Sequence, residues 1–201
     1  MPTDIESAAT AIAARLVQHD AEPASSFPRD RSATDRAGFY SWWSDEPGLQ
    51  TLSETLGADL PSLLYVGHAG LLASDTRQNE TLYSRLNGTE LHGDTRSSDF
   101  RRSLSAILRV SFSLHLIEGE TYITTGYLDA RGNNVVSDWI RSHLCLSTVP
   151  VSARDSTIEY RHTLVESVLS KVNAPLNWKG MPTTPVRETL FMLRGALTNI
   201  S

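Results

Sequence analysis

The sequence is poor in cysteine and has no long apolar run. Cys145 is the only cysteine, which excludes an internal disulfide and a zinc site built from cysteines. The longest apolar candidate, residues 105–117, is interrupted by an arginine and a histidine, so we expect no membrane span. The first residues include Asp4 and Glu6 and lack the apolar region of a secretory signal. We therefore expect a cytoplasmic protein that is not attached to a membrane.

An excess of basic residues is also absent. The formal net charge of −5 has the wrong sign for a protein that holds nucleic acid by overall attraction. The local balance is different between positions 77 and 109, where six arginines accompany four acidic residues. The arginines are Arg77, Arg85, Arg96, Arg101, Arg102 and Arg109. This modest basic patch permits phosphate binding without demonstrating it.

The hydrophobic pattern predicts one main domain in a chain of 201 residues. We expect an N-terminal helix and a linker over residues 1–32, followed by the main domain over 33–201, with an insertion around 110–134. The fold class we predict is α/β (α+β), a small and mainly antiparallel central sheet flanked by helices. The predicted strands cover residues 38–43, 62–67 and 145–151, and the alternating residues from Val110 onward predict a hairpin with 122–128. The remaining periodic segments predict helices.

Two short apolar strands each carry a tyrosine and a glycine. They are Gly38-Phe39-Tyr40 and Tyr65-Val66-Gly67. If the two strands pair in the right register, both tyrosine hydroxyls point into one shallow pocket. Gly67 then leaves room for a backbone or a phosphate to approach. Taken alone, two tyrosines in a sheet are much more often core aromatics than catalysts.

Five motifs in order resemble the GIY-YIG nuclease family. The two tyrosine strands stand where that family has its two signatures, and Arg85 lies in the following helix where the family has an arginine. Glu166-Ser167-Val168-Leu169 and Pro175-Leu176-Asn177 match the family's later glutamate and its Pro-x-Asn. The resemblance covers about residues 38 to 177. One departure is that position 89, one helical turn beyond Arg85, is not a histidine, and His92 is a candidate to replace it.

The resemblance implies a role for each matched residue. Tyr40 or Tyr65 would act as a base or water relay, Glu166 would bind Mg²⁺ or Mn²⁺, and Asn177 would shape the site by hydrogen bonding. The planar guanidinium of Arg85 suits a phosphate whatever the family. His92 is a catalytic candidate or an ordinary loop histidine.

Four further residues are candidates for contact with nucleic acid: His68, Arg77, Arg101 and Arg102. Arg101 and Arg102 form either a track for the DNA backbone or a solvated helix face. The function we predict is a divalent-metal-dependent endonuclease acting on DNA. A nucleic-acid-binding module with lost or weak catalysis and a protein-interaction domain remain as alternatives, and the sequence leaves the oligomeric state open.

Overall fold

A computed structural model describes residues 2–18, 20–28, 30–72, 80–117, 127–152 and 157–197. The longer helices in chain order are α1 (Pro2–Val17), α3 (Glu46–Leu56), α4 (Asp99–Phe112), α5 (Ala130–His143), α6 (Ile158–Val172) and α7 (Pro185–Ala196). The shorter helices are η1 (Ala24–Ser26), α2 (Arg31–Thr34) and η2 (Ser84–Leu91). The strands are β1 (Glu22–Pro23), β2 (Gly38–Ser44), β3 (Leu63–Ala69), β4 (Leu116–Ile117), β5 (Tyr127–Leu128) and β6 (Leu144–Pro150).

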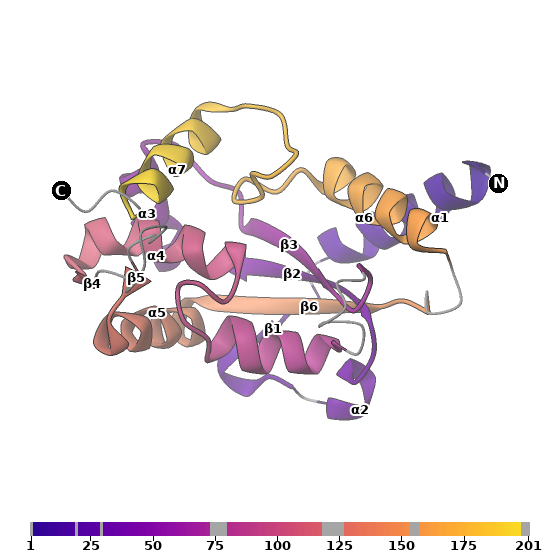
Figure 1. Cartoon of the computed structure of the whole chain (residues 1–201), viewed down its shortest axis with the longest axis horizontal. Coiled ribbons are helices and arrows are strands. Elements are labelled where there is room, and N and C mark those ends of the chain that lie inside the picture. The colour runs from indigo at the N-terminus through magenta and orange to yellow at the C-terminus, as the bar shows by residue number, and fades with distance from the viewer. Residues whose placement is uncertain are drawn as a thin grey trace.

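A four-stranded antiparallel sheet lies at the centre of the molecule (Figure 1). Its strand order is β1-β6-β2-β3, so β2 is paired on both sides. All seven residues of β2 are buried, and its register with β3 places Tyr40 opposite Gly67 and Trp42 opposite Tyr65. β4 and β5 form a separate two-stranded sheet. The predicted α+β fold class is therefore confirmed.

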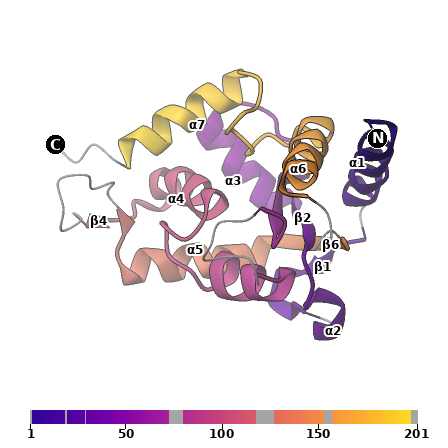
Figure 2. The same cartoon turned by 45° about the vertical axis from the view of Figure 1, so that its right-hand side comes forward.

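Helices cover the two faces of this sheet and create two apolar cores. α1 and α6 pack against each other and against one face, where Phe39, Val66 and Val149 are buried with Leu16 and Val168. The other face meets α3, α4, α5 and η2, and its core includes Tyr40 and Tyr65. Figure 2 shows α1 beside α6 at one end of the molecule, with α4, α5 and α7 toward the other. The alternation of side chains along β2 sends Phe39 and Tyr40 into different cores.

Two segments differ from the sequence-based expectation. Residues 22–23, in the segment predicted as a linker, add β1 to the edge of β6. The strand expected from Val110 is instead the end of α4, which continues to Phe112, and both side chains are about half exposed. α4 ends because Ser113 adopts a left-handed conformation and caps the Arg109 carbonyl. Of the predicted partner segment 122–128, residues 127–128 form β5 and pair with β4, and residues 118–126 lie outside the described residues.

The helix that carries Arg85 is a π-helix. In η2, backbone hydrogen bonds join residues five apart, so side chains at that spacing lie nearer each other around the axis than in an α-helix. In an α-helix the same two residues would be separated by about 140° around the axis. Arg85 and Glu90 are five residues apart, so η2 places them on the same face. Helices of this type are rare and often found at functional sites.

Candidate active site

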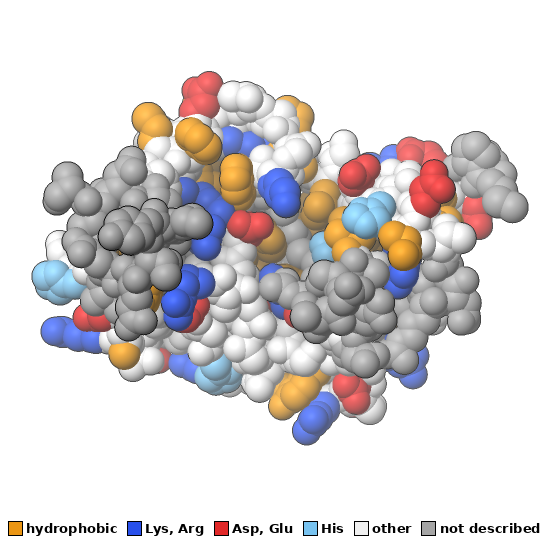
Figure 3. Space-filling model, viewed as in Figure 1, with side chains coloured by type: hydrophobic (Ala, Val, Ile, Leu, Met, Phe, Trp, Pro, Cys, Tyr) orange, Lys and Arg blue, Asp and Glu red, His pale blue; other side chains and the backbone are white. Residues whose placement is uncertain are grey.

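One open cleft of about 890 Å³ runs between β3, η2, α6 and the loop after α6. Among the residues that line it are Tyr40, Tyr65, His68, Glu80, Arg85, Asp99, His162, Glu166, Asn177, Trp178 and Lys179. Figure 3 shows a hollow near the middle of this face with acidic, basic and histidine side chains around it. The structure thus brings Tyr40, Tyr65, Arg85 and Glu166, which come from four separate elements, to one cleft.

The two tyrosines share a face of the sheet because of the strand register. Tyr40 lies opposite Gly67, while Tyr65 lies opposite Trp42, so the rings of Tyr40 and Tyr65 come within 6.5 Å of each other. A Cβ atom at position 67 would collide with the phenol of Tyr40. The expected free space above Gly67 is therefore filled by the Tyr40 ring, which explains why the second motif needs glycine there.

Both tyrosine hydroxyls hold their protons tightly. Burial, followed by the charge of Glu90, raises the pKa of Tyr40 well above its usual value. The same two causes, in the same order, raise the pKa of Tyr65. The neutral phenol therefore predominates for both side chains near neutral pH.

Arg85 and Tyr40 meet at a buried carboxylate. The Tyr40 hydroxyl donates a hydrogen bond to Oε1 of Glu90 at 2.8 Å, and Arg85 Nε donates one to the same oxygen at 2.9 Å. Arg85 Nη1 also lies 3.5 Å from Oε1 of Glu80. Burial on its own would lower the pKa of Arg85, but the neighbouring Tyr40 and Glu90 more than reverse this effect. Arg85 is therefore a fixed cation at the wall of the cleft.

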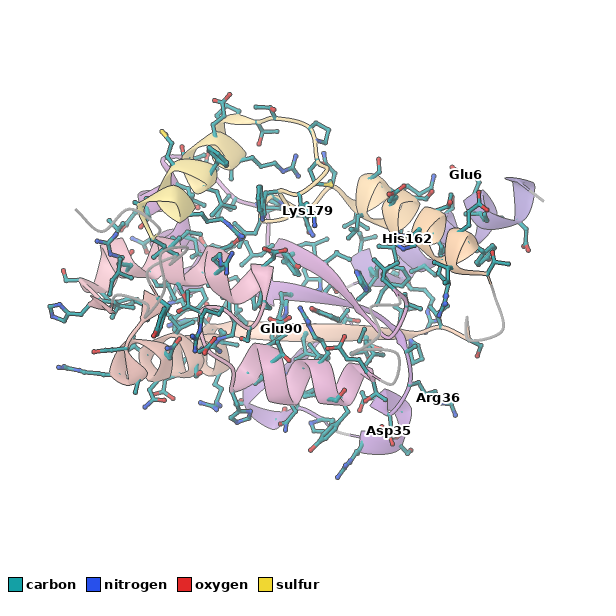
Figure 4. All side chains as sticks on the ribbon, viewed as in Figure 1. Glu6, Asp35, Arg36, Glu90, His162 and Lys179 are labelled. Carbon is teal, nitrogen blue, oxygen red and sulfur yellow. The ribbon has the colours of Figure 1, made fainter. Side chains whose placement is uncertain are left out.

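Three carboxylates line the cleft among the described residues, and two of them are paired. Glu80 lies beside Arg85, and Asp99 accepts from Arg194 at 2.7 Å. Glu166, which is exposed on α6, has no hydrogen bond or ion pair with another described residue. Its helix also carries His162 one turn earlier on the cleft side, and Figure 4 labels that residue.

The donor set at Glu166 suits a hydrated divalent cation and does not suit a fully protein-bound one. The described residues contain no group of three or more His, Cys, Asp or Glu side chains that could enclose a metal ion. Mg²⁺ usually keeps several waters and needs only one or two protein carboxylates. A free, exposed carboxylate at the edge of a cleft fits that requirement.

Asn177 completes the free edge of β3. Its side-chain oxygen accepts from the Val66 N–H at 2.8 Å, and its amide donates to the Val66 carbonyl at 2.7 Å. The Leu176 N–H bonds the Leu64 carbonyl in the same manner. Asn177 thus replaces a neighbouring strand and fixes the backbone between Tyr65 and Gly67.

A buried arginine holds the loop after α6 in place through hydrogen bonds. Arg187 of α7 donates to the backbone carbonyls of Asn173, Ala174, Asn177 and Pro182. Burial lowers the pKa of this guanidinium. The same loop presents Trp178 and the exposed Lys179 to the cleft, and Figure 4 labels Lys179 on it.

The other candidates have different positions. His68 is half-buried on β3 and lines the cleft. His92 is exposed at the end of η2, where its Nδ1 lies 2.6 Å from the Asn87 carbonyl oxygen, and it does not line the cleft. Arg77 lies outside the described residues, and Arg102 is half-buried on α4, away from the cleft lining.

Arg101 requires a correction. We expected it on a DNA track or a solvated helix face, but its side chain is completely buried. It donates to the carbonyls of Glu90 and Asn133 and to the Ser137 hydroxyl, and burial lowers its pKa to about 10. The sequence did not reveal this, because the polar groups that Arg101 contacts come from η2 and α5.

Sequence reasoning missed Glu90, Trp178 and Lys179. Glu90 gave no signal, because α-helical geometry turns it away from Arg85. Trp178 and Lys179 directly follow the Pro-x-Asn motif, and that adjacency could have drawn attention to them.

Comparison with known proteins identifies the family of the chain. The family model described as the GIY-YIG catalytic domain matches residues 38–196. Neither the curated proteins nor the solved structures contain a match to the chain. None of the described helices is both long and apolar enough to cross a membrane. The matched range contains both tyrosine strands, the π-helix with Arg85, and the α6 helix with Glu166. The chain belongs to the GIY-YIG catalytic-domain family, whose members are nucleases.

Proposed function

We propose that this protein is a divalent-metal-dependent endonuclease that hydrolyses phosphodiester bonds in DNA. The observation that carries the proposal is the convergence of Tyr40, Tyr65, Arg85 and Glu166 on one open cleft. Phosphodiester hydrolysis requires in-line attack by water, stabilisation of phosphoryl charge and support for the leaving oxygen. The cleft offers a group suited to each of the first two tasks.

Each residue has a task that follows from its surroundings. Arg85, fixed by Glu80 and Glu90, offers the remainder of its guanidinium to a phosphoryl oxygen. The Tyr40 hydroxyl can accept a hydrogen bond from the attacking water while it donates to Glu90. Glu166 would hold the metal, which supplies Lewis-acid stabilisation of phosphoryl charge when bound.

The rim of the cleft supports binding of the nucleic acid. Lys179 is exposed beside Trp178, and an ammonium next to an aromatic ring suits a phosphate followed by a base. Asn177 keeps the wall in shape through its two bonds to Val66. His68 faces the same cleft and extends this contact surface along β3.

A second function is favoured by one observation. Arg85 is neutralised by two carboxylates, Glu80 and Glu90, which weakens its attraction for a phosphoryl group. A protein of this kind could bind DNA and cleave it poorly or not at all. The same assay separates this binding module from the endonuclease.

The test is cleavage of supercoiled plasmid with Mg²⁺ or Mn²⁺ and with a chelator. We expect metal-dependent nicking by the parent protein and its loss in Glu166→Gln, by at least about 100-fold. DNA affinity without metal should persist or increase, because a negative charge has left the cleft. The melting temperature should stay close to that of the parent, since the Glu166 side chain is exposed and forms no hydrogen bond or ion pair with another described residue.

Glu159→Gln is the matched control. It makes the same change at another exposed position of the same helix, outside the cleft lining, and should leave cleavage unchanged. Full metal-dependent activity in Glu166→Gln would place the metal ligand elsewhere. DNA binding by the parent without cleavage under any metal condition would establish the binding module instead.

A further inference from the structure

Glu90 is a carboxylate with no exposed surface, close to the end of η2. A buried carboxylate is costly unless several donors compensate for its lost hydration. Three side chains do so: Tyr40 and Arg85 donate to Oε1, and Ser98 donates to Oε2 at 2.6 Å. Figure 4 labels Glu90 near the centre of the molecule.

The position of this carboxylate is fixed from both sides. Ser98 is the N-cap of α4, where its hydroxyl also accepts from the Arg101 N–H. Arg101 in turn donates to the backbone carbonyl of Glu90 at 2.8 Å. α4 therefore holds Glu90 at its backbone and at its distal oxygen, so that Oε1 is directed at the hydroxyl of Tyr40.

We propose that Glu90 is a positioning residue that orients the Tyr40 hydroxyl and receives its proton while Tyr40 takes a proton from the attacking water. The inference rests on the proposed endonuclease function and deepens it. As the water oxygen forms its bond to phosphorus, its proton moves to Tyr40 Oη, and the phenolic proton moves to Oε1 of Glu90. The bond from phosphorus to the leaving oxygen breaks, and that oxygen takes the electron pair and a proton from solvent. The proton on Glu90 then returns through Tyr40 to solvent.

The relay resolves a difficulty of the cleft. Burial and the adjacent Glu90 raise the pKa of Tyr40 well above its usual value, so a free phenolate is scarcely populated near neutral pH. If Tyr40 gives up one proton as it gains another, no phenolate has to form. A hydrogen bond of 2.8 Å to a carboxylate provides the path for that transfer.

Glu90→Gln separates the relay from a merely structural role. The amide oxygen of glutamine can still accept from Tyr40 and Arg85, and its amino group can donate to Ser98, but it cannot take the proton. In single-turnover cleavage we expect the rate at saturating DNA to fall by at least about 100-fold. The DNA concentration that gives half of the maximal rate should change by less than about threefold. If Glu90 only held its neighbours in place, the substitution would change both the rate at saturating DNA and the DNA concentration at half-maximal rate, or neither.

A double-mutant cycle provides the decisive comparison. In a Tyr40→Phe background, Glu90→Gln should lower the rate by no more than about threefold, because Glu90 acts through Tyr40. Ser137→Ala is the stability control: it removes one buried hydrogen bond of Arg101 without touching Glu90 or Tyr40. We expect its rate per folded molecule to equal that of the parent.

The outcomes are distinct. A parent that does not cleave DNA overturns the proposed function and this inference together. A parent that cleaves, with Glu90→Gln equally active or additive with Tyr40→Phe, overturns the inference alone. If Glu90→Gln does not fold, the rate of the parent in mixtures of H₂O and D₂O decides. A curved dependence indicates two protons in flight and supports the relay, whereas a linear dependence rejects it.

Discussion

Tyr40 and Gly67 form a matched pair across β2 and β3. The ring of Tyr40 lies over Gly67 so closely that any side chain there would displace it. This contact, together with the bond to Glu90, leaves the Tyr40 hydroxyl one orientation. At the scale of single residues, a steric contact and a hydrogen bond together fix the position of Tyr40 in the cleft.

Tyrosine ionisation provides a test at this scale. The pKa values of Tyr40 and Tyr65 lie above the value of about 10 expected in the unfolded chain. Below about pH 10 both states keep these protons, so their contribution to stability is fully present there. Above it, the unfolded chain loses protons that the folded chain retains, so the free energy of unfolding should fall as pH rises.

We expect an absorbance titration of tyrosinate to show that at least two of the six tyrosines ionise only as the protein unfolds. In the Tyr65→Phe variant, stability should decline less steeply above about pH 10. Ionisation of all six tyrosines near pH 10 in the folded state would contradict the buried position of the pair.

The loop that follows α6 acts as a substitute strand for the exposed edge of β3. Asn177 pairs with both backbone groups of Val66, and Arg187 holds the loop by its carbonyls. An unpaired buried backbone group costs about as much as a lost hydrogen bond. The edge of the sheet and the wall of the cleft are therefore one structural element.

Asn177→Leu tests this element. It keeps the approximate volume but leaves the Val66 N–H and carbonyl unpaired, so we expect a loss of about 2–4 kcal/mol in the free energy of unfolding. Denaturant unfolding measures this loss, and Asn134→Leu, at an exposed position on α5, is the control. A loss below about 0.5 kcal/mol would mean that water replaces the amide.

At the scale of the whole molecule, net charge and local charge have opposite signs. The protein carries −5 overall, so in the proposed function the attraction for DNA has to come from particular cations. The neighbouring arginines of α4 have opposite situations, since Arg101 is buried and Arg102 is partly exposed. Sequence proximity does not make them equivalent.

We predict that Arg101→Ala and Arg102→Ala separate stability from binding. Arg101→Ala removes three hydrogen bonds and leaves a cavity in the interior, so it should lower the free energy of unfolding by about 2–4 kcal/mol. Arg102→Ala should retain stability and reduce the slope of log affinity against log salt by about 1. An unchanged slope would assign Arg102 to a solvated surface without contact to DNA.

Several features followed from the sequence alone because they depend on neighbours along the chain. Short apolar runs predicted the strands that carry Tyr40 and Tyr65, and helical spacing together with the order of motifs predicted the segments that carry Arg85 and Glu166. Left-handed Gly57 ends α3, and the N-cap Ser98 begins α4. These are local conformational preferences of the backbone and side chains, so they can be predicted from residues that are close in sequence.

The tertiary structure alone decided the positions of Glu90 and Arg101. Each carries a charge that sequence patterns assign to the surface. Both are buried because α4 and η2 pack so that each charge meets donors or acceptors from distant segments. The π-helical turn that aligns Glu90 with Arg85 depends on the same packing. Some of the partners that make these placements favourable lie up to 50 residues away along the chain, so no local pattern specifies them.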